Sequence, residues 1–166
     1  EGIQAPLLAS IDTVEHQYRL IDSLEGVKAM AAKLGELKSF CFDTETTGLD
    51  PLEAELVGIA FSWKEHQATY IAFGEDKKTT QEWLEPLKEV FGNQRIEKIG
   101  QNIKYDLHIL KNYEIEVKGR LFDTMLAHFI LKPEQKHNLN LLAEQYLDYS
   151  MFKIESLIGK KGSLQA

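Results

Sequence analysis

The chain has 166 residues, 43% of them hydrophobic and 27% charged, which is the size and composition of one globular domain with a single core. Its formal net charge of −7 argues against a protein that holds nucleic acid on a broad basic surface, although contact with phosphate through a bound metal stays open. The single cysteine, Cys41, permits no disulfide within the chain, and without a long apolar run or a secretion signal the chain is expected to be cytoplasmic and not membrane-spanning.

The first half of the chain is predicted to contain an edge strand, one helix and three strands that pair as an antiparallel meander. Asp22 or Ser23 caps the helix, and apolar residues at helical spacing continue to Leu34 before Gly35 ends it. The meander strands are rich in Val, Ile and Phe, and a hairpin near His66 joins the last two. In chain order the segments are an extended N-terminal stretch (1–13), the edge strand (15–21), the helix (22–34), an acidic strand from residue 39, and two further strands (55–63 and 68–73).

The second half is predicted to contain four further helices and one strand. Thr79 or Thr80 caps a helix over 81–91, and a strand over 96–100 then runs directly into another helix. Because a helical crossover precedes this strand, it is expected to pair in parallel with the acidic strand. The remaining elements are a helix to residue 131 that Asp123 caps and Pro133 ends, and a last helix over 137–146 with Leu139, Leu142, Ala143 and Tyr146 facing inward.

The stretch 39–50 carries two acidic side chains at the end of a predicted strand. Side chains alternate along a strand, so Asp43 and Glu45 share a face with Cys41, their Cα atoms about 6–7 Å apart. That face is expected to be buried, and two carboxylates there need a cation, which no Lys or Arg in the stretch supplies. Gly48 marks a sharp turn that places the acids at the carboxyl end of the strand, where active sites collect. The simpler alternative is that both acids end the strand and face solvent.

A second acidic position lies where the 96–100 strand passes into the next helix. If Asn102 caps that helix, Asp106 lies one turn in, on the same face. Taken alone, the pair has a structural explanation as a cap and a surface acid near the positive end of the helix dipole. Taken with the acidic strand, Asp43, Glu45 and Asp106 would meet at one edge of the sheet.

Three carboxylates in one place predict a particular chemistry. Oxygen-only sites favour Mg²⁺ or Mn²⁺ over zinc, and the five histidines show no zinc-type pairing. Two such ions, about 3.5–4 Å apart, activate a water on one side of a phosphodiester and stabilise the departing oxygen on the other. The residues alone therefore predict metal-dependent phosphoryl hydrolysis.

Four blocks of the sequence, in order, resemble a known family. They are Phe42-Asp43-Thr44-Glu45-Thr46-Thr47-Gly48-Leu49-Asp50, Val57-Gly58-Ile59-Ala60-Phe61, Ile99-Gly100-Gln101-Asn102-Ile103-Lys104-Tyr105-Asp106 and Phe122-Asp123-Thr124-Met125-Leu126. Together they resemble the 3′-5′ proofreading exonuclease domain of bacterial DNA polymerase I, a DEDD exonuclease, over about residues 21–162. The resemblance implies an α/β, ribonuclease H-like fold with a five-stranded mixed sheet, an antiparallel meander plus parallel strands, flanking helices and two ions, Mg²⁺ or Mn²⁺.

The resemblance also implies roles for individual residues. Asp43, Glu45 and Asp106 match the first three catalytic, metal-binding carboxylates: Asp43 would bridge both ions, Glu45 would bind one and help orient the attacking water, and Asp106 would hold the second. The residues that match substrate contacts are Thr46, Leu49, Gln101, Asn102 and Tyr105. Leu49 would wedge against the terminal base, with a buried turn residue as the alternative, and Tyr105 would stack on a base, with core packing as the alternative.

One part of the family pattern is missing. The fourth carboxylate should come from a Tyr-x-x-x-Asp motif on a later helix, and the one match, Tyr18 to Asp22, precedes the acidic strand and is interpreted as a coincidence. Asp123 and Asp148 have structural explanations as a helix cap and a helix-end surface residue. Residues 1–166 are therefore expected to be a single exonuclease domain truncated before that helix, with a flexible tail from Gly159, and to hydrolyse DNA weakly or not at all.

The expected substrate is the 3′ end of single-stranded DNA, and the expected partner is a polymerase domain of the same parent chain. Two alternatives stay open. One is a stand-alone 3′-5′ exoribonuclease of the same superfamily, which contacts to a 2′-hydroxyl would distinguish. The other is a catalytically silent structural module of a polymerase, which would be expected to have lost the three acids that this chain keeps.

Overall fold

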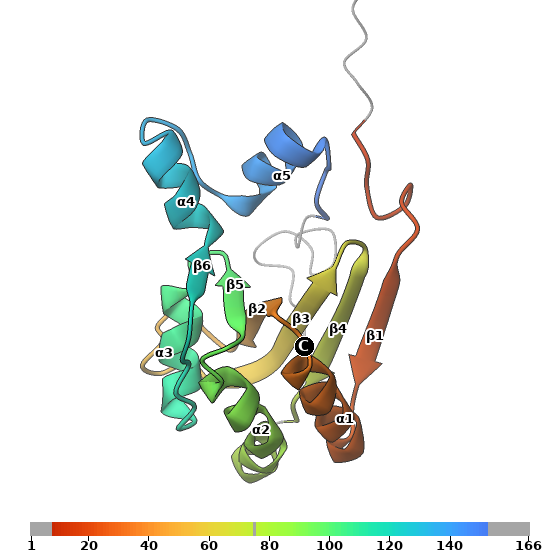
Figure 1. The fold of residues 1–166 in the computed structure, drawn as a ribbon, viewed down its shortest axis with the longest axis vertical. Helices are drawn as coiled ribbons and strands as arrows, with labels where there is room; N and C mark the ends of the chain where they lie inside the picture. Colours follow the sequence, from red (N-terminus) through yellow and green to blue (C-terminus); the bar gives the residue numbers. More distant parts are fainter. Residues whose placement is uncertain (1–7, 75, 153–166) are drawn as a thin grey trace, which may run out of the picture. The chain divides into compact units, whose positions relative to one another are not determined.

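The computed structural model describes residues 8–74 and 76–152, which belong to two compact units. The larger unit spans Gln17–Pro133 and holds a sheet and four of the described helices (Figure 1). Its strands are β1 (Gln17–Ile21), β2 (Ser39–Thr46), β3 (Leu56–Lys64), β4 (Gln67–Ala72), β5 (Glu97–Gly100) and β6 (Leu121–Asp123). Its helices are α1 (Leu24–Gly35), α2 (Lys77–Gly92), α3 (Lys104–Asn112) and α4 (Thr124–Leu131).

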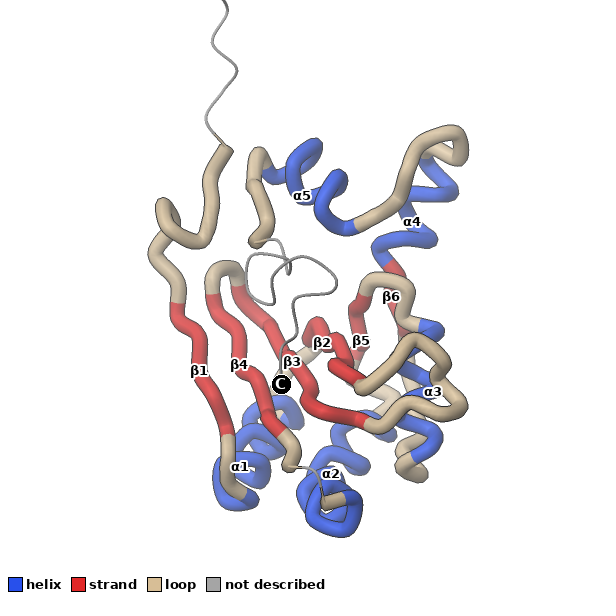
Figure 2. The backbone as a smooth tube through the Cα atoms, turned by 180° about the vertical axis from the view of Figure 1, so that it is seen from behind, coloured by secondary structure: helices blue, strands red, loops and turns tan. Residues whose placement is uncertain are grey.

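The six described strands form one mixed sheet in the order β1-β4-β3-β2-β5-β6 (Figure 2). The antiparallel meander of β2, β3 and β4 and the parallel pairing of β5 with β2 are both confirmed. β1 is an edge strand, as predicted, and pairs in parallel with β4. The predicted number of five strands is wrong, because β6 pairs in parallel with β5. With three residues, β6 is too short to show the alternation by which a strand is recognised in a sequence.

The apolar core of the larger unit lies on one face of the sheet, where α1, α2 and α3 contribute buried residues. Four phenylalanine rings form its centre, with ring centroids 5.0 to 6.4 Å apart and mostly edge-to-face: Phe40, Phe42, Phe61 and Phe91. Each such pair contributes about 0.5–1.5 kcal/mol beyond the area it buries. Because alternate residues of β2 enter this core, the residues between them point to the other face of the sheet.

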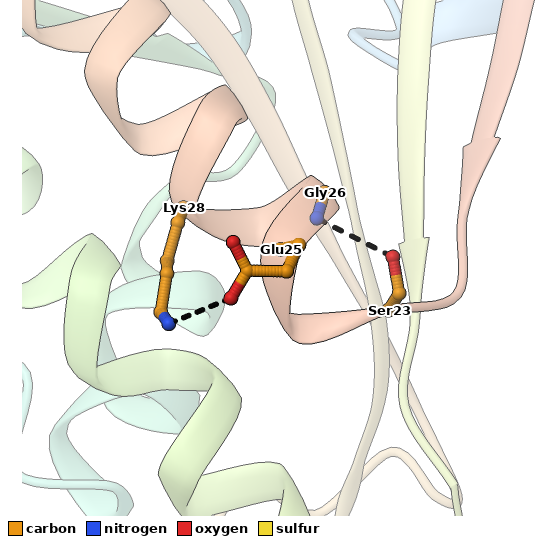
Figure 3. Close-up of polar contacts among 4 residues, drawn as sticks. All are labelled: Ser23, Glu25, Gly26 and Lys28. Atoms are coloured by element: carbon orange, nitrogen blue, oxygen red, sulfur yellow. Dashed lines mark hydrogen bonds and ion pairs between the residues drawn. The ribbon is translucent and has the colours of Figure 1, made fainter.

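The start of α1 follows the predicted capping pattern. Ser23 has extended backbone angles, and its Oγ accepts a hydrogen bond from the Gly26 N–H at 3.3 Å (Figure 3). Glu25 and Lys28 form an ion pair of 2.8 Å on the exposed side of the same turn. A Cβ on Gly26 would lie 2.8 Å from the Cγ2 of Ile21, so glycine lets the helix start close to the end of β1. Of the two predicted caps, Ser23 is the one that acts.

The start of α2 differs from the prediction by four residues. The helix begins at Lys77, not at Gln81, and Asp76 is its cap. The Oδ2 of Asp76 accepts hydrogen bonds from Thr79 N at 2.8 Å and Thr79 Oγ1 at 2.6 Å. Thr79 and Thr80 are thus inside the helix. The prediction failed because the first turn holds two lysines and two threonines, which give no apolar periodicity.

Lys98 lies in β5 with its side chain in the core. The residue is 0% exposed, and its Nζ donates hydrogen bonds to the carbonyl oxygens of Asn93 at 2.6 Å and Lys118 at 2.8 Å. Asn93 is the C-cap of α2, where a positive charge is favoured by the helix dipole. Burial lowers the pKa of Lys98 to about 8. One ammonium group therefore ties the end of α2 to the segment that leads into β6.

We expect the stability contributed by Lys98 to rise with pH. Its folded-state pKa of about 8 lies below that of an unfolded lysine, so between these values the unfolded chain binds the extra proton and folding gains free energy. Urea unfolding of the wild type and Lys98→Met should show the wild type gaining about 1–2 kcal/mol over the variant between about pH 7.5 and 9.5. A difference that stays constant over this range would mean that Lys98 keeps an ordinary pKa.

The smaller unit consists of residues 1–16 and 134–166, of which the structure describes 8–16 and 134–152. Ala9 forms a parallel bridge with Tyr149, and α5 (Leu139–Leu147) is capped by Asn138. Of the four residues predicted to face inward, Leu142 and Ala143 are buried, whereas Leu139 and Tyr146 are 42% and 52% exposed, so the prediction for these two is wrong. The predicted flexible tail from residue 159 lies outside the described residues. Across the described ranges no helix is both long and apolar enough to cross a membrane.

Candidate functional site

The carboxyl end of β2 carries acidic side chains on the face of the sheet that points away from the core. Asp43 and Glu45 are exposed, whereas Phe42 and Thr44 are buried, as strand alternation requires. Cys41 shares the exposed face with the two acids. The predicted alternation is therefore correct, but the expectation that this face is buried is wrong.

Asp106 approaches β2 from the first turn of α3. It is 2% exposed, so it is not the surface acid of the simpler interpretation. Its Oδ1 accepts hydrogen bonds from Thr44 N at 2.8 Å and Thr44 Oγ1 at 2.6 Å. The pairing of β5 with β2 ends at Cys41, so Thr44 lies beyond the part of β2 that pairs with β5. The Asp106 carboxylate supplies the acceptor that the N–H of Thr44 needs. Asp106 is thus fixed to the residue that stands between Asp43 and Glu45 in the sequence.

Asp106 and Glu45 both act electrostatically on Asp43. The pKa of Asp43 is raised to about 6, chiefly because its carboxylate loses water and then because of the charges of Asp106 and Glu45. Since Asp43 as a residue is exposed, water screens part of this repulsion. Burial also raises the pKa of Asp106, against the opposing effect of the hydrogen bonds from Thr44. In the described part of the chain, no Lys or Arg forms an ion pair with any of the three.

These donors suit a hard divalent cation. Carboxylate oxygens are the ligands that Mg²⁺ and Mn²⁺ prefer, and a cation would relieve the repulsion that, after burial, contributes to the raised pKa of Asp43. Within residues 8–74 and 76–152, no three Asp, Glu, His or Cys side chains are grouped closely enough to hold an ion by themselves. Mg²⁺ commonly uses one or two carboxylates, several waters and substrate phosphates. The acids at the end of β2 therefore fit a magnesium or manganese site that water and phosphate complete.

Tyr105 holds the turn that follows β2. Its hydroxyl donates to the carbonyl oxygen of Gly48 at 2.7 Å and lies 2.6 Å from Thr46 Oγ1, which is 2.9 Å from the same carbonyl. The Tyr105 ring packs against the core, as the core-packing alternative expects, while its hydroxyl contacts the turn. Leu49, the next residue in this turn, is 95% exposed, which rules out the alternative that it is a buried turn residue.

Asp123 holds the loop between β5 and α3. The sequence predicts Asn102 as the cap of α3, but Asn102 has a left-handed φ of 59° and α3 starts after Ile103 with no side-chain cap, so that prediction is wrong. The Asp123 carboxylate instead accepts hydrogen bonds from Asn102 N at 3.1 Å and Ile103 N at 3.0 Å. As predicted, it also caps α4, accepting from Met125 N at 2.8 Å and Leu126 N at 3.2 Å.

The two predicted substrate contacts in this loop have different surroundings. Gln101 is half-buried, and its Oε1 accepts a hydrogen bond from Thr124 Oγ1, which also reaches the carbonyl oxygen of Gly100 at 3.1 Å. Asn102 is exposed. The loop is therefore fixed to the start of α4 by both Asp123 and Thr124, while Asn102 presents its side chain to solvent.

Two residues that organise the site were not among those predicted for it. Thr44 holds Asp106, and its signal in the sequence is a polar residue at a core-facing strand position between two acids. Asp123 was predicted only as a helix cap, and nothing in the local sequence points to its second role, because Asn102 is 21 residues away.

Comparisons with known proteins match nearly the whole chain, including these acids. A family described as 3′-5′ exonuclease matches residues 18–163. DNA polymerase I of Pseudomonas aeruginosa is 31% identical over 166 residues, which cover 95% of this chain and 18% of that protein. DNA polymerase I of Borreliella burgdorferi is 35% identical over 155 residues, covering 91% of this chain and 17% of that protein. The chain thus spans less than a fifth of the length of these relatives.

Solved structures with a similar fold include nucleases. The catalytic core of RRP6 from Trypanosoma brucei aligns with a TM-score of 0.70 at 18% identity, covering 89% of this chain and 39% of that one. RNase D of Escherichia coli, an exoribonuclease involved in structured RNA processing, aligns with a TM-score of 0.65 at 20% identity, covering 86% of this chain and 36% of that one. The mixed, helix-flanked sheet and these neighbours confirm the predicted ribonuclease H-like fold class.

Proposed function

The chain belongs to the 3′-5′ exonuclease family, and from that membership we propose that it removes nucleotides from the 3′ end of single-stranded DNA as the proofreading domain of a DNA polymerase I. The observation that carries the proposal is the position of three acids around the carboxyl end of β2: Asp43 and Glu45 share its exposed face, and Asp106 is hydrogen-bonded to Thr44 between them. No described Lys or Arg forms an ion pair with these acids. Such a concentration of negative charge is what a cation site requires, and the bound cation in turn would hold a phosphodiester.

The three acids divide the work at this site. When bound, Mg²⁺ or Mn²⁺ would lower the pKa of an attacking water and offset charge on the departing oxygen. Asp43 and Glu45 supply exposed carboxylates on one strand face, and Glu45, with its longer side chain, is suited to orient the water. Asp106 is fixed by Thr44, so its carboxylate does not need to be ordered when a cation arrives.

The residues around the acids are suited to hold the end of a strand. Leu49 is almost fully exposed on a turn that Thr46 and Tyr105 fix, which suits a wedge against the terminal base. Gln101 and Asn102 lie in the loop that precedes α3, the helix that carries Asp106. Contacts from a fixed turn and a fixed loop to sugar, phosphate and base stack would tolerate any base, as proofreading demands.

The wider setting is also part of the proposal. A chain with a net charge of −7 would rely on a polymerase domain of the parent protein for a basic DNA-binding surface. The cytoplasm is the proposed location, where a free thiol such as Cys41 stays reduced. No Tyr-x-x-x-Asp follows Asp106 in the 166 residues, so the fourth carboxylate is proposed to lie outside them and the chain to act weakly or not at all by itself.

A hydrolysis assay tests the proposal. The chain is incubated with a 5′-labelled single DNA strand and Mn²⁺, and with an RNA strand of the same sequence. We expect slow, stepwise shortening from the 3′ end, faster on DNA, that EDTA stops and a 3′-terminal phosphorothioate retards. The same chain extended through the next segment of its parent protein should act faster. Internal cleavage would contradict the exonuclease assignment, and a preference for RNA would favour the exoribonuclease alternative.

A further inference from the structure

Tyr70 lies on the same face of the sheet as the acids. Strand pairing gives its position: Asp43 is opposite Ala60 of β3, and Ala60 is opposite Tyr70 of β4. Residues that are directly paired on neighbouring strands point to the same face. The Cα atom of Tyr70 therefore lies level with that of Asp43, two strands away and about 10 Å from it.

Gly58 allows the Tyr70 ring to lean toward Glu45. A Cβ on Gly58 would lie 2.0 Å from the Tyr70 hydroxyl oxygen and 2.2 Å from Cζ, so the phenol end of the ring lies directly over the Gly58 backbone. Gly58 is the residue paired with Glu45. The hydroxyl is thus one strand spacing, about 5 Å, from the backbone of Glu45. Any side chain at position 58 would occupy the place of the hydroxyl.

The Tyr70 hydroxyl is a hydrogen-bond donor that no described residue uses. After the effect of burial, the charge of Glu45 is what raises the pKa of Tyr70, so the two groups are within electrostatic range. Glu45 is exposed, and rotation of its long side chain can bring its carboxylate to the phenol. A hydrogen bond from a hydroxyl to a carboxylate is among the stronger kinds in proteins.

We propose that Tyr70 is a positioning residue for Glu45: its hydroxyl, placed over Gly58, donates a hydrogen bond to the Glu45 carboxylate and fixes the orientation in which that carboxylate meets the cation. This inference rests on the proposed function, since it assumes that Glu45 is a ligand. An outer partner of this kind orients a flexible carboxylate and raises both metal affinity and rate. Tyr70 itself is not expected to contact the reacting atoms.

Mn²⁺ binding without substrate tests the proposal directly. In calorimetric titrations, Tyr70→Phe should bind Mn²⁺ about 10-fold more weakly than the wild type, because Phe keeps the ring over Gly58 and loses only the donor. In a Glu45→Gln background, where the carboxylate is absent, the same change should have no further effect. Tyr18→Phe is the matched control, since Tyr18 is an exposed tyrosine on the same face in β1, paired with Ala68.

Hydrolysis gives a second readout that a structural role would not move. Tyr70→Phe should lower kcat about 10-fold and leave the KM for DNA within about twofold. Equal Mn²⁺ affinity in the wild type and Tyr70→Phe would overturn the role of Tyr70 and leave the proposed function standing. Mn²⁺ binding that responds to Tyr70, in a protein that does not hydrolyse DNA even when it is extended through the next segment of its parent, would overturn only the proposed function. A wild type that does not bind Mn²⁺ would overturn both.

Discussion

Asp43→Asn is expected to lower the rate of 3′-end hydrolysis by about 10³-fold or more, the largest effect on activity that we predict. Asparagine keeps the shape of the side chain and one acceptor oxygen but removes the negative charge that would bind a cation. Because Asp43 is the acid whose pKa responds to both Asp106 and Glu45, it occupies the electrostatic centre of the group. Hydrolysis of a 5′-labelled DNA strand in Mn²⁺ under single-turnover conditions measures the loss.

The same substitution should make the metal-free chain more stable. The pKa of Asp43 is raised in the folded state, so the ionised carboxylate costs folding free energy at pH 8, and asparagine removes that cost. After screening by solvent we expect a gain of about 1 kcal/mol, seen as a rise in Tm of about 2–4 °C in EDTA. Loss of activity together with a gain in stability would separate a functional carboxylate from a structural one.

Cys41→Ser is the matched control, because Cys41 shares the strand and the exposed face with Asp43 but carries no charge at neutral pH. It should change neither the rate nor the Tm appreciably. If Asp43→Asn kept more than about a tenth of the wild-type rate, Asp43 could not be a metal ligand of the kind proposed.

The features of this fold that could be predicted from the sequence are those in which side chains repeat at the short period of a strand or a helix. Alternation in β2 put Asp43 and Glu45 on one face, and helical spacing located α1 from Ser23 onward. The parallel pairing of β5 with β2 was predicted because a helical crossover precedes β5, and strands joined by such a crossover pair in parallel in most folds. What could not be predicted was how far each face is covered, since that depends on which elements pack there. The expected burial of the acids failed for this reason.

The contacts that organise the site come from residues far apart in the chain. Asp106 bonds to Thr44, 62 residues away, and Tyr105 bonds to Thr46, 59 residues away. Spacing along one segment carries no information about such pairs. The loop before α3 is a second case, because the left-handed backbone of Asn102 removes it from the capping position. A local signal for a cap was present there, and a distant carboxylate took the backbone N–H groups instead.

Asp123→Ala is expected to have the largest effect on stability. The carboxylate accepts hydrogen bonds from four backbone N–H groups, two in the loop before α3 and two at the start of α4. Loss of a helix cap costs about 1 kcal/mol, and loss of a charged acceptor to two further donors adds about 2 kcal/mol or more. We therefore expect a loss of about 3 kcal/mol and a fall in Tm of about 6–12 °C. Urea unfolding at pH 7 measures it.

Ser23→Ala is the control for a simple cap, because Ser23 accepts from one N–H group, that of Gly26, in the same unit. It should cost about 1 kcal/mol. If Asp123→Ala cost no more than this control, the hydrogen bonds from Asn102 and Ile103 would contribute nothing to folding. Hydrogen exchange gives a local readout, since the amides of these two residues should lose protection in Asp123→Ala and keep it in Ser23→Ala.

Asp123→Asn then separates geometry from charge in the effect of Asp123 on the site. The pKa of Asp106 is raised mainly by burial and in smaller part by the charge of Asp123. Asparagine removes that charge and one acceptor, but it keeps an oxygen for Asn102 and the two donors of α4. If Asp123 acts by holding the loop that leads into α3, stability and hydrolysis should both fall in the order wild type, Asp123→Asn, Asp123→Ala. If its charge were what matters at Asp106, the two variants would have the same rate despite their different stabilities.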